Sequence, residues 1–327
     1  MKRLGLCIVF VSLLAAAAGA VVARADGLPV QGVDIGGVGL VAASGEARYV
    51  TLPARRDTVL ARVKPAGGQI ADSRLLRGEF TIPAVAYDGS AGGLSADGKT
   101  LVLIVPRASF PRVTTGLIVI DTRRLRPRMR VTLQGDFSFD AISPRGSLLY
   151  LIEYVSPKDP TRYVVRTYDL RSGRLLARPV IDPREPGEKM RGAPLTRATS
   201  GDGRWAYTLY DGAGQAPFVH ALDTSTASAR CIDLDTLAGA DLSKLRFRLD
   251  GAGHTLTVGT NQQALAIVDT RTFGVSTPTS PALAAERDTG HIPWTRVALA
   301  SAGLLVAAAG SVFGLLRRHR RRLAAVQ

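Results

Sequence analysis

The feature that most constrains the fold is a repeat of short apolar segments joined by glycine turns. Five turns recur at steps of 53, 48, 57 and 50 residues, and their glycines are Gly45, Gly98, Gly146, Gly203 and Gly253. In the last four copies an aspartate closes a later apolar run, at steps of 48, 54 and 46 residues: Asp121, Asp169, Asp223 and Asp269. Two markers with one shared period indicate a repeat architecture in which each unit stacks on its neighbours.

Each copy offers about four short strands joined by tight turns. Four antiparallel strands repeated radially form the blades of a β-propeller. We therefore predict an all-β fold, a β-propeller of five four-stranded blades over residues 26–275. The number rises to six if a degenerate blade lies between Gly68 and Gly92, and residues 27–35 are expected to add a strand that closes the ring.

One repeat carries a resemblance to a known class of protein. The turn Leu94–Gly98, followed by a strand and then by a strand ending in Ile120–Thr122, resembles YVTN-type propeller repeats, relatives of the WD-repeat class, in a membrane-anchored bacterial form. The resemblance spans residues 44–274. No tryptophan precedes the aspartates and the Gly-His pair of the WD class is missing, so the resemblance implies the fold and says little about function.

The first 25 residues have the pattern of a secretory signal peptide. Lys2 and Arg3 precede an apolar run over residues 4–22. Ala23 and Ala25 follow, and they are small residues at the two positions that a signal peptidase recognises. We expect cleavage before Asp26, with an uncleaved anchor as the alternative. In either case the body is exported, because the positive end stays inside.

The other end of the chain predicts a membrane anchor. A linker over residues 276–293 leads into a transmembrane α-helix over residues 294–316, in which twenty successive residues carry no charge. As a helix these twenty span about 30 Å, the thickness of a bilayer core. The tail 317–327 supplies the cytoplasmic stop with Arg317, Arg318, Arg320, Arg321 and Arg322. The lipid bilayer is thus an expected partner of a single-pass cell-membrane protein whose body lies outside.

Small residues line one face of this predicted helix, at Gly303, Ala307, Gly310 and Gly314. Such a face lets two helices approach closely in lipid and favours a homodimer through the membrane segment. The alternative is composition alone, since the segment is rich in alanine and glycine throughout.

Charge and cysteine content narrow the classes of partner. The net charge is +15, but nine basic residues lie at or beyond the two terminal apolar segments. The other 33 basic residues and all 27 acidic residues lie in the body, whose net charge is therefore about +6. So small an excess of positive charge argues against nucleic acid as a partner. Cys231 is alone in the processed body, so no intramolecular disulfide is expected there.

No motif in the sequence points to a metal, a cofactor or a catalytic centre. We assign the repeat aspartates a structural role, because an aspartate that ends a strand accepts hydrogen bonds from the following turn. The acidic stretch over residues 233–241 lacks the ligand pattern of a calcium loop, and the four histidines lack zinc spacing. No Gly-x-Ser-x-Gly elbow occurs.

These observations favour a non-catalytic binding or scaffold protein at the cell envelope. The alternative is a propeller hydrolase, lactonase-like, with an axial active site assembled from residues far apart in sequence. A deep axial cavity where carboxylates and histidines converge would favour the enzyme, and a shallow funnel of mixed residues would favour binding.

The expected binding face carries the loops between second and third strands together with those between successive blades. These loops are longer than those of the opposite face and hold six candidate contacts for an envelope protein or an anionic envelope ligand: Arg107, Phe110, Arg112, Lys158, Arg184 and Arg191. The arginines between positions 123 and 130 offer a second anionic site, or simply a charged edge strand that resists aggregation.

Overall fold

The computed structural model describes residues 39–278, apart from residues 67 and 188. All of them belong to one compact unit of the chain, which ends at Thr279. The predicted signal peptide, ring-closing strand, transmembrane helix and basic tail lie outside the described residues, as does most of the linker. Within residues 39–278, no helix is long and apolar enough to cross a membrane.

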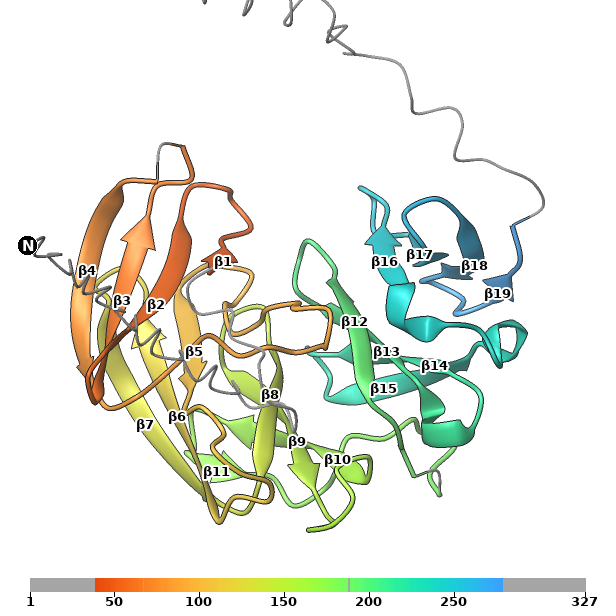
Figure 1. Cartoon of the computed structure of the whole chain (residues 1–327), viewed down its shortest axis with the longest axis horizontal. Helices are drawn as coiled ribbons and strands as arrows, with labels where there is room; N and C mark the ends of the chain where they lie inside the picture. Colours follow the sequence, from red (N-terminus) through yellow and green to blue (C-terminus); the bar gives the residue numbers. More distant parts are fainter. Residues whose placement is uncertain (1–38, 67, 188, 279–327) are drawn as a thin grey trace, which may run out of the picture. The chain divides into compact units, whose positions relative to one another are not determined.

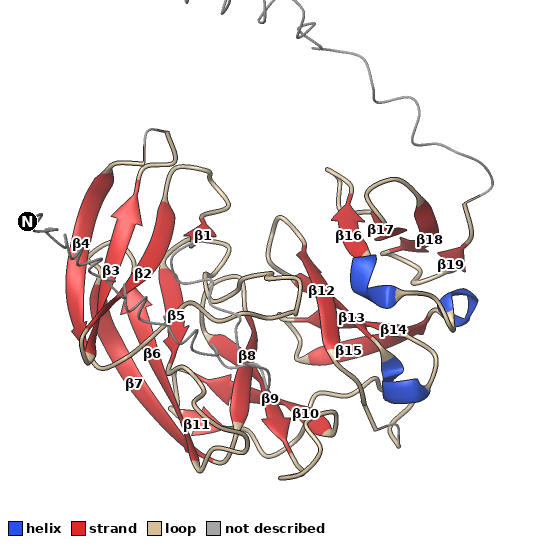
Figure 2. Ribbon diagram, viewed as in Figure 1, coloured by secondary structure: helices blue, strands red, loops and turns tan. Residues whose placement is uncertain are grey.

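The described residues form five antiparallel sheets that follow one another in chain order (Figures 1 and 2). We number them I to V. Sheet I contains β1 (Leu40–Val41), β2 (Arg48–Ala54), β3 (Asp57–Val63) and β4 (Ile70–Arg77). Sheet II contains β5 (Thr100–Ile104), β6 (Thr114–Asp121) and β7 (Arg126–Gln134). Sheet III contains β8 (Phe137–Ile142), β9 (Leu148–Tyr154), β10 (Tyr163–Asp169) and β11 (Arg174–Leu175).

Sheets IV and V complete the series. Sheet IV contains β12 (Pro194–Thr199), β13 (Trp205–Tyr210), β14 (Phe218–Asp223) and β15 (Ser228–Asp233). Sheet V contains β16 (Arg246–Leu249), β17 (Thr255–Gly259), β18 (Ala264–Asp269) and β19 (Val275–Ser276). Three short 3-10 helices lie in loops: η1 (Gly212–Gly214), η2 (Asp235–Leu237) and η3 (Leu242–Lys244).

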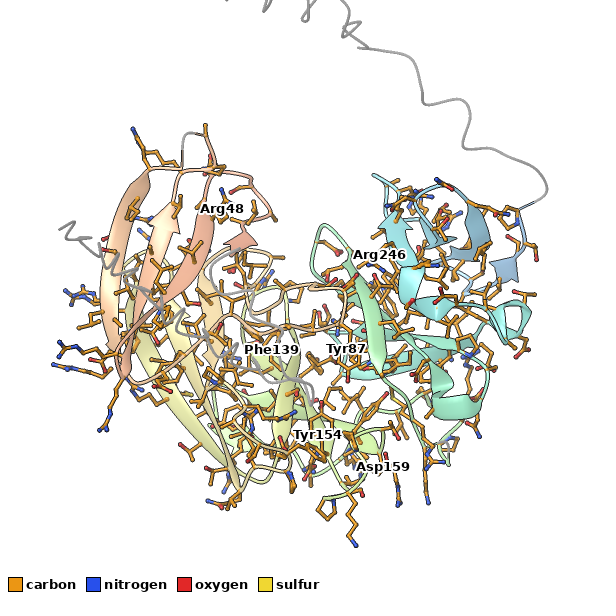
Figure 3. All side chains as sticks on the ribbon, in the orientation of Figure 1. Arg48, Tyr87, Phe139, Tyr154, Asp159 and Arg246 are labelled. Atoms are coloured by element: carbon orange, nitrogen blue, oxygen red, sulfur yellow. The ribbon has the colours of Figure 1, made fainter. Side chains whose placement is uncertain are left out.

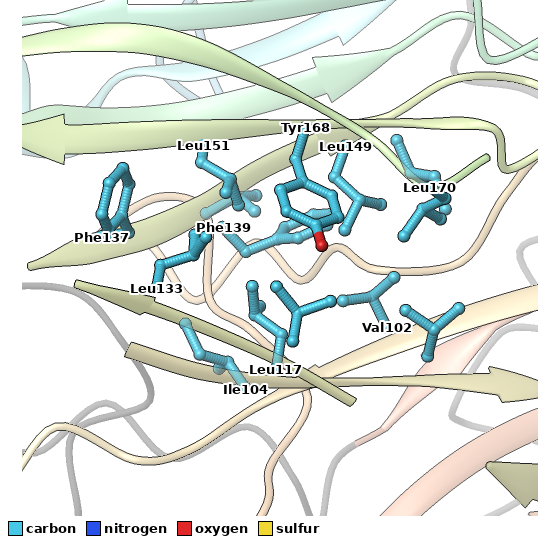
Figure 4. Packing of buried hydrophobic residues seen from close by; sticks show 14 residues of the cluster. Val102, Ile104, Leu117, Leu133, Phe137, Phe139, Leu149, Leu151, Tyr168 and Leu170 are labelled. Carbon is cyan, nitrogen blue, oxygen red and sulfur yellow. The ribbon is translucent and has the colours of Figure 1, made fainter. Parts of the chain in front are cut away.

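Four hydrophobic clusters lie between consecutive sheets, one for each neighbouring pair. Figure 4 shows the cluster between sheets II and III, where Val102 and Leu117 face Leu149 and Leu151. All four side chains are fully or almost fully buried, and burial of one such side chain contributes about 1.5–3 kcal/mol. Because each sheet buries apolar residues against the next, the fold is all-β and β-propeller-like, as the repeat predicts. Sheet II departs from the predicted four strands: it has three, and the segment before β5 adds only an isolated bridge between Leu94 and Leu101.

The repeat glycines all have positive φ, between 66° and 72°. That region is open to glycine and strained for other residues, which explains why glycine marks the period. Their surroundings differ. A Cβ on Gly203 would lie 2.6 Å from the Cβ of Ala96 in a turn of sheet II, whereas Gly253 has nothing within 4 Å. In some copies the glycine therefore also allows one turn to pack against another.

The stretch between Gly68 and Gly92 does not form a further blade. It contains β4 and then a hairpin over residues 83–92, closed by the bridge between Ala84 and Ala91. We call this segment the axial hairpin. It extends from the edge of sheet II to sheet IV. There the N–H groups of Tyr87 and Asp88 donate to the carbonyls of Pro194 (2.9 Å) and Leu195 (3.2 Å). The Asp88 carboxylate lies 3.8 Å from the Arg246 guanidinium of sheet V.

Candidate functional site

A groove between sheets III and IV is the largest hollow that we describe. Its volume is about 720 Å³, within the range of roughly 300–1,000 Å³ found for ligand sites. It exists because β11 pairs with only the last two residues of β10. The chain pairs again with Val165 of β10 at Val180, and with Arg162, just before β10, at Arg191. The residues between Val180 and Arg191 arch away from the strand. We call this hollow the III/IV groove.

One buried carboxylate fixes the base of the arch to sheet IV. Asp182 is 3% exposed and accepts hydrogen bonds from the backbone N–H groups of Arg184 (2.9 Å) and Cys231 (3.0 Å). The guanidinium of Arg184 donates to the same carboxylate at 2.6 Å, and that of Arg230 lies 3.4 Å away. Burial alone would raise the pKa of Asp182, but these hydrogen bonds outweigh it and lower the pKa to about 2.

The lining of the III/IV groove combines exposed apolar side chains with positive charge. Val155 is 53% exposed and Ile181 is 39% exposed, and both line the groove. Three exposed basic side chains are among its described lining residues: Arg162, Lys189 and Arg191. The described lining contains two carboxylates, Asp182 and Glu185, and two arginines neutralise Asp182. The arrangement suits an extended ligand with apolar side chains and negative charge.

The six candidate contacts predicted from the sequence divide into two groups. Lys158, Arg184 and Arg191 lie in the two loops that border the III/IV groove. Arg191 lines the groove and lies 3.8 Å from Asp159, which Figure 3 labels in the same region. Arg184 is half exposed and donates to Asp182 and to the carbonyl of Cys231 (3.1 Å). The sequence did not single out Arg162, Lys189 or the exposed apolar side chains, since a single charged or apolar loop residue carries no pattern.

The other three candidates, Arg107, Phe110 and Arg112, form a separate cluster. Arg107 and Arg112 both bind the carboxylate of Asp136, which is 4% exposed. The Arg107 guanidinium lies 4.9 Å from the ring centroid of Tyr154, labelled in Figure 3, and 5.7 Å from that of Phe110. Burial lowers the pKa of the Arg112 guanidinium to about 10. These side chains hold the loop after β5 in place, and their part in binding stays a prediction.

The four repeat aspartates each accept backbone hydrogen bonds from the turn that follows. Asp121, for example, accepts from the N–H groups of Arg123 (2.9 Å) and Arg124 (3.1 Å), and Asp269 accepts from those of Arg271 and Thr272. The same geometry recurs at Asp169 and Asp223. One oxygen of each carboxylate is therefore engaged within its own turn, and the other oxygen of Asp223 accepts from the guanidinium of Arg204.

Potential metal ligands do not gather at one point in the described part of the chain. No group of three or more His, Cys, Asp or Glu residues there is placed to hold a metal. A central cavity beside the axial hairpin is lined by Asp140, but its described lining contains no histidine. His220 is fully buried in sheet IV, and the loss of solvation lowers its pKa to about 4.

Comparisons with known proteins give distant structural likenesses only. No protein-family model matches the chain, and no curated protein matches it. A functionally unknown protein from Desulfotomaculum acetoxidans DSM 771 is 12% identical, with 73% of this chain and 67% of that chain covered and a TM-score of 0.46. TolB from Acinetobacter baumannii is also 12% identical, with 70% and 50% covered and a TM-score of 0.42. The hydrazine synthase of Kuenenia stuttgartiensis is 17% identical, with 70% and 75% covered and a TM-score of 0.38.

Proposed function

We propose that this protein is a membrane-anchored, extracytoplasmic β-propeller that acts as a non-catalytic binding or scaffold protein. The III/IV groove would hold an extended segment of a partner polypeptide that carries acidic and apolar side chains. The observation that carries this proposal is the groove itself, which combines exposed Val155 and Ile181 with three basic side chains.

Charge complementarity selects this occupant. An acidic segment would meet Arg162, Lys189 and Arg191, and its negative charge would speed the encounter and fix its register. Its apolar residues would cover Val155 and Ile181, which are otherwise in contact with water. A basic segment would be repelled by the same cations and is therefore expected to bind poorly.

A rigid base supports this role. Loops that bind partners work best when a fixed scaffold positions them, and Asp182 ties the arch to sheet IV through backbone and side-chain hydrogen bonds. The apolar anchor predicted at residues 294–316 and the signal peptide at residues 1–25 support placement of the groove outside the cytoplasmic membrane. A short tether would keep it within reach of other envelope proteins.

The test measures binding of a labelled peptide to the full chain in lipid nanodiscs. The probe is a fluorescein-labelled peptide of alternating glutamate and valine, and its counterpart replaces each glutamate with lysine. We expect the acidic peptide to bind and the basic one to bind at least tenfold more weakly. Each lost charge contact contributes about 0.2–1 kcal/mol at an exposed site, so Arg162→Glu combined with Lys189→Glu should weaken the acidic peptide about tenfold.

Two further variants make the result specific to the groove. Arg171→Glu combined with Arg174→Glu makes the same change of charge at two exposed positions, in the turn before β11 and at the start of that strand, and it should leave binding within about twofold. Val155→Ser should weaken binding without any change of charge. If both pairs of charge reversals had the same effect, or if the two peptides bound equally, the groove would not be the binding site.

A further inference from the structure

A second cavity lies beside the axial hairpin, among residues that belong to or adjoin four of the sheets. Its volume is about 270 Å³, many times the roughly 10–15 Å³ that one water molecule needs. The walls come from four sheets: residues 40–43, residues 91–96, residues 139–142, and residues from 197 to 206. The axial hairpin separates it from a hollow of about 30 Å³ that is lined by Tyr87 and Tyr154.

The charged part of this central cavity is one buried ion pair. Arg197 on β12 donates from Nη2 to Oδ1 of Asp140 on β8. The exposed fraction of the side chain is 2% for Asp140 and 5% for Arg197. The pair has no net charge, so a charged ligand would bring an unbalanced charge into a desolvated site.

Asp140 lies in an irregularity of the pairing between β8 and β9. Phe139 pairs with Leu151 and Ala141 pairs with Tyr150, which leaves Asp140 as the extra residue of a β-bulge. A bulge redirects a side chain, and bulges occur often beside functional sites. Here the bulge places a carboxylate at the axis, in a strand whose other residues are mostly apolar.

The ion pair retains unused hydrogen-bonding capacity. Within the described residues, Asp140 Oδ2 and Arg197 Nε have no hydrogen-bond partner. A buried charged group that lacks partners is unfavourable. Both atoms are shielded from solvent, so a ligand would reach them only after a rotation of the two side chains within the cavity wall.

Three of the four other side-chain hydroxyls of the lining are already engaged within the protein, and the fourth belongs to Thr199, at an exposed position. The hydroxyls of Ser95 and Ser200 donate to Asp97 (2.7 Å) and Asp202 (2.6 Å) in their own turns. The hydroxyl of Thr224 donates to the carbonyl of Gly203 at 2.8 Å. Apolar side chains such as Leu40 and Val85 form much of the remaining wall. Selectivity in this cavity would therefore come from the Asp140–Arg197 pair.

We propose that the central cavity binds a small neutral ligand that carries a hydrogen-bond donor next to an acceptor. The donor would bind Asp140 Oδ2, and the acceptor would receive the N–H of Arg197 Nε. A vicinal diol of a sugar and a cis-amide both present this edge, and each has an apolar side for the walls. The proposal is independent of peptide binding in the III/IV groove.

The test is ligand-observed NMR, by saturation transfer from the full chain in nanodiscs. Three probes of similar size separate the chemistries: methyl α-D-glucopyranoside for the diol, δ-valerolactam for the cis-amide, and cyclohexanecarboxylate as a charged control. We expect transfer to the diol, the lactam or both, and none to the carboxylate. Transfer to one neutral probe alone would support the proposal and would identify the class of ligand.

Variants connect any signal to this cavity. Asp140→Asn keeps the size of the side chain and removes its charge, and loss of one charge-assisted hydrogen bond should weaken binding about tenfold. Should that variant fail to fold, Ala43→Phe still decides, because Ala43 lines the cavity at an exposed position and a phenyl group there would block it. The matched control is Ala240→Phe, at an exposed position outside the cavity lining. Equal signals from the two phenylalanine variants, or no transfer to either neutral probe, would overturn the proposal.

Discussion

Replacement of Asp182 by asparagine tests the anchor of the III/IV groove most directly. The carboxylate is almost fully buried and receives hydrogen bonds from two backbone N–H groups and from Arg184. Asp182→Asn keeps the shape of the side chain and removes its charge. The arch over the groove should then be held less firmly to sheet IV.

The size of the effect follows from the pKa of Asp182. Burial would raise this pKa, but the stronger hydrogen bonds lower it from the ordinary 3.8 to about 2, a difference equivalent to about 2 kcal/mol. Because the folded-state pKa is the lower one, this stabilisation is present in full above the ordinary pKa. It is lost as the pH falls through the folded-state value, so about 1 kcal/mol should remain near pH 3.

The assay is urea unfolding of the full chain, followed by tryptophan fluorescence and by circular dichroism. Trp294→Phe is present in every protein compared, so that the emission comes from Trp205 in sheet IV. The free energy of unfolding of Asp182→Asn should be lower than that of the wild type by about 2 kcal/mol near pH 6, and by about half as much near pH 3. Glu185→Gln removes a charge from an exposed position of the same arch and should change stability by less than about 0.5 kcal/mol. An equal loss at both pH values, or an equal loss in Glu185→Gln, would refute this account of Asp182.

The remaining predictions concern packing, buried charge and topology. Gly203→Ala should lower the free energy of unfolding by about 1–3 kcal/mol more than Gly253→Ala, measured in urea, because both glycines have a φ of 72° and only the first would also clash with a neighbouring turn. Asp136→Asn leaves the buried Arg107 and the half-buried Arg112 without their counter-ion and should cost about 3–5 kcal/mol in the same assay. A reporter fused after Gln327 should be cytoplasmic, and protease added outside intact protoplasts should digest the body. A protected body would contradict the predicted export.

The sequence alone predicted the local elements of this fold well. The strands that end in the repeat aspartates lie where the period places them, since a turn aspartate hydrogen-bonds with residues only two or three positions away. The repeat glycines predict turns for the same reason, because their positive φ is a local property. Stretches whose structure depends on local backbone chemistry can be read from composition and spacing.

The tertiary structure decided which side chains are available for binding. Sequence reasoning placed Arg107 and Arg112 in a loop of the expected binding face. Their burial depends on Asp136, which lies more than twenty positions further along the chain and is brought to them by the pairing of sheets. The axial hairpin likewise could not be predicted, since its hydrogen-bond partners at Pro194 and Leu195 are about a hundred residues away.

The two proposed sites depend on the same kind of non-local geometry. The III/IV groove exists because β11 is short and the following loop is tied to the next sheet through Asp182. The central cavity has a polar end because a bulge in β8 brings Asp140 to Arg197 of another sheet. A periodic pattern determines which residues share a strand, whereas packing of one sheet against another determines which charges meet and which hollows remain.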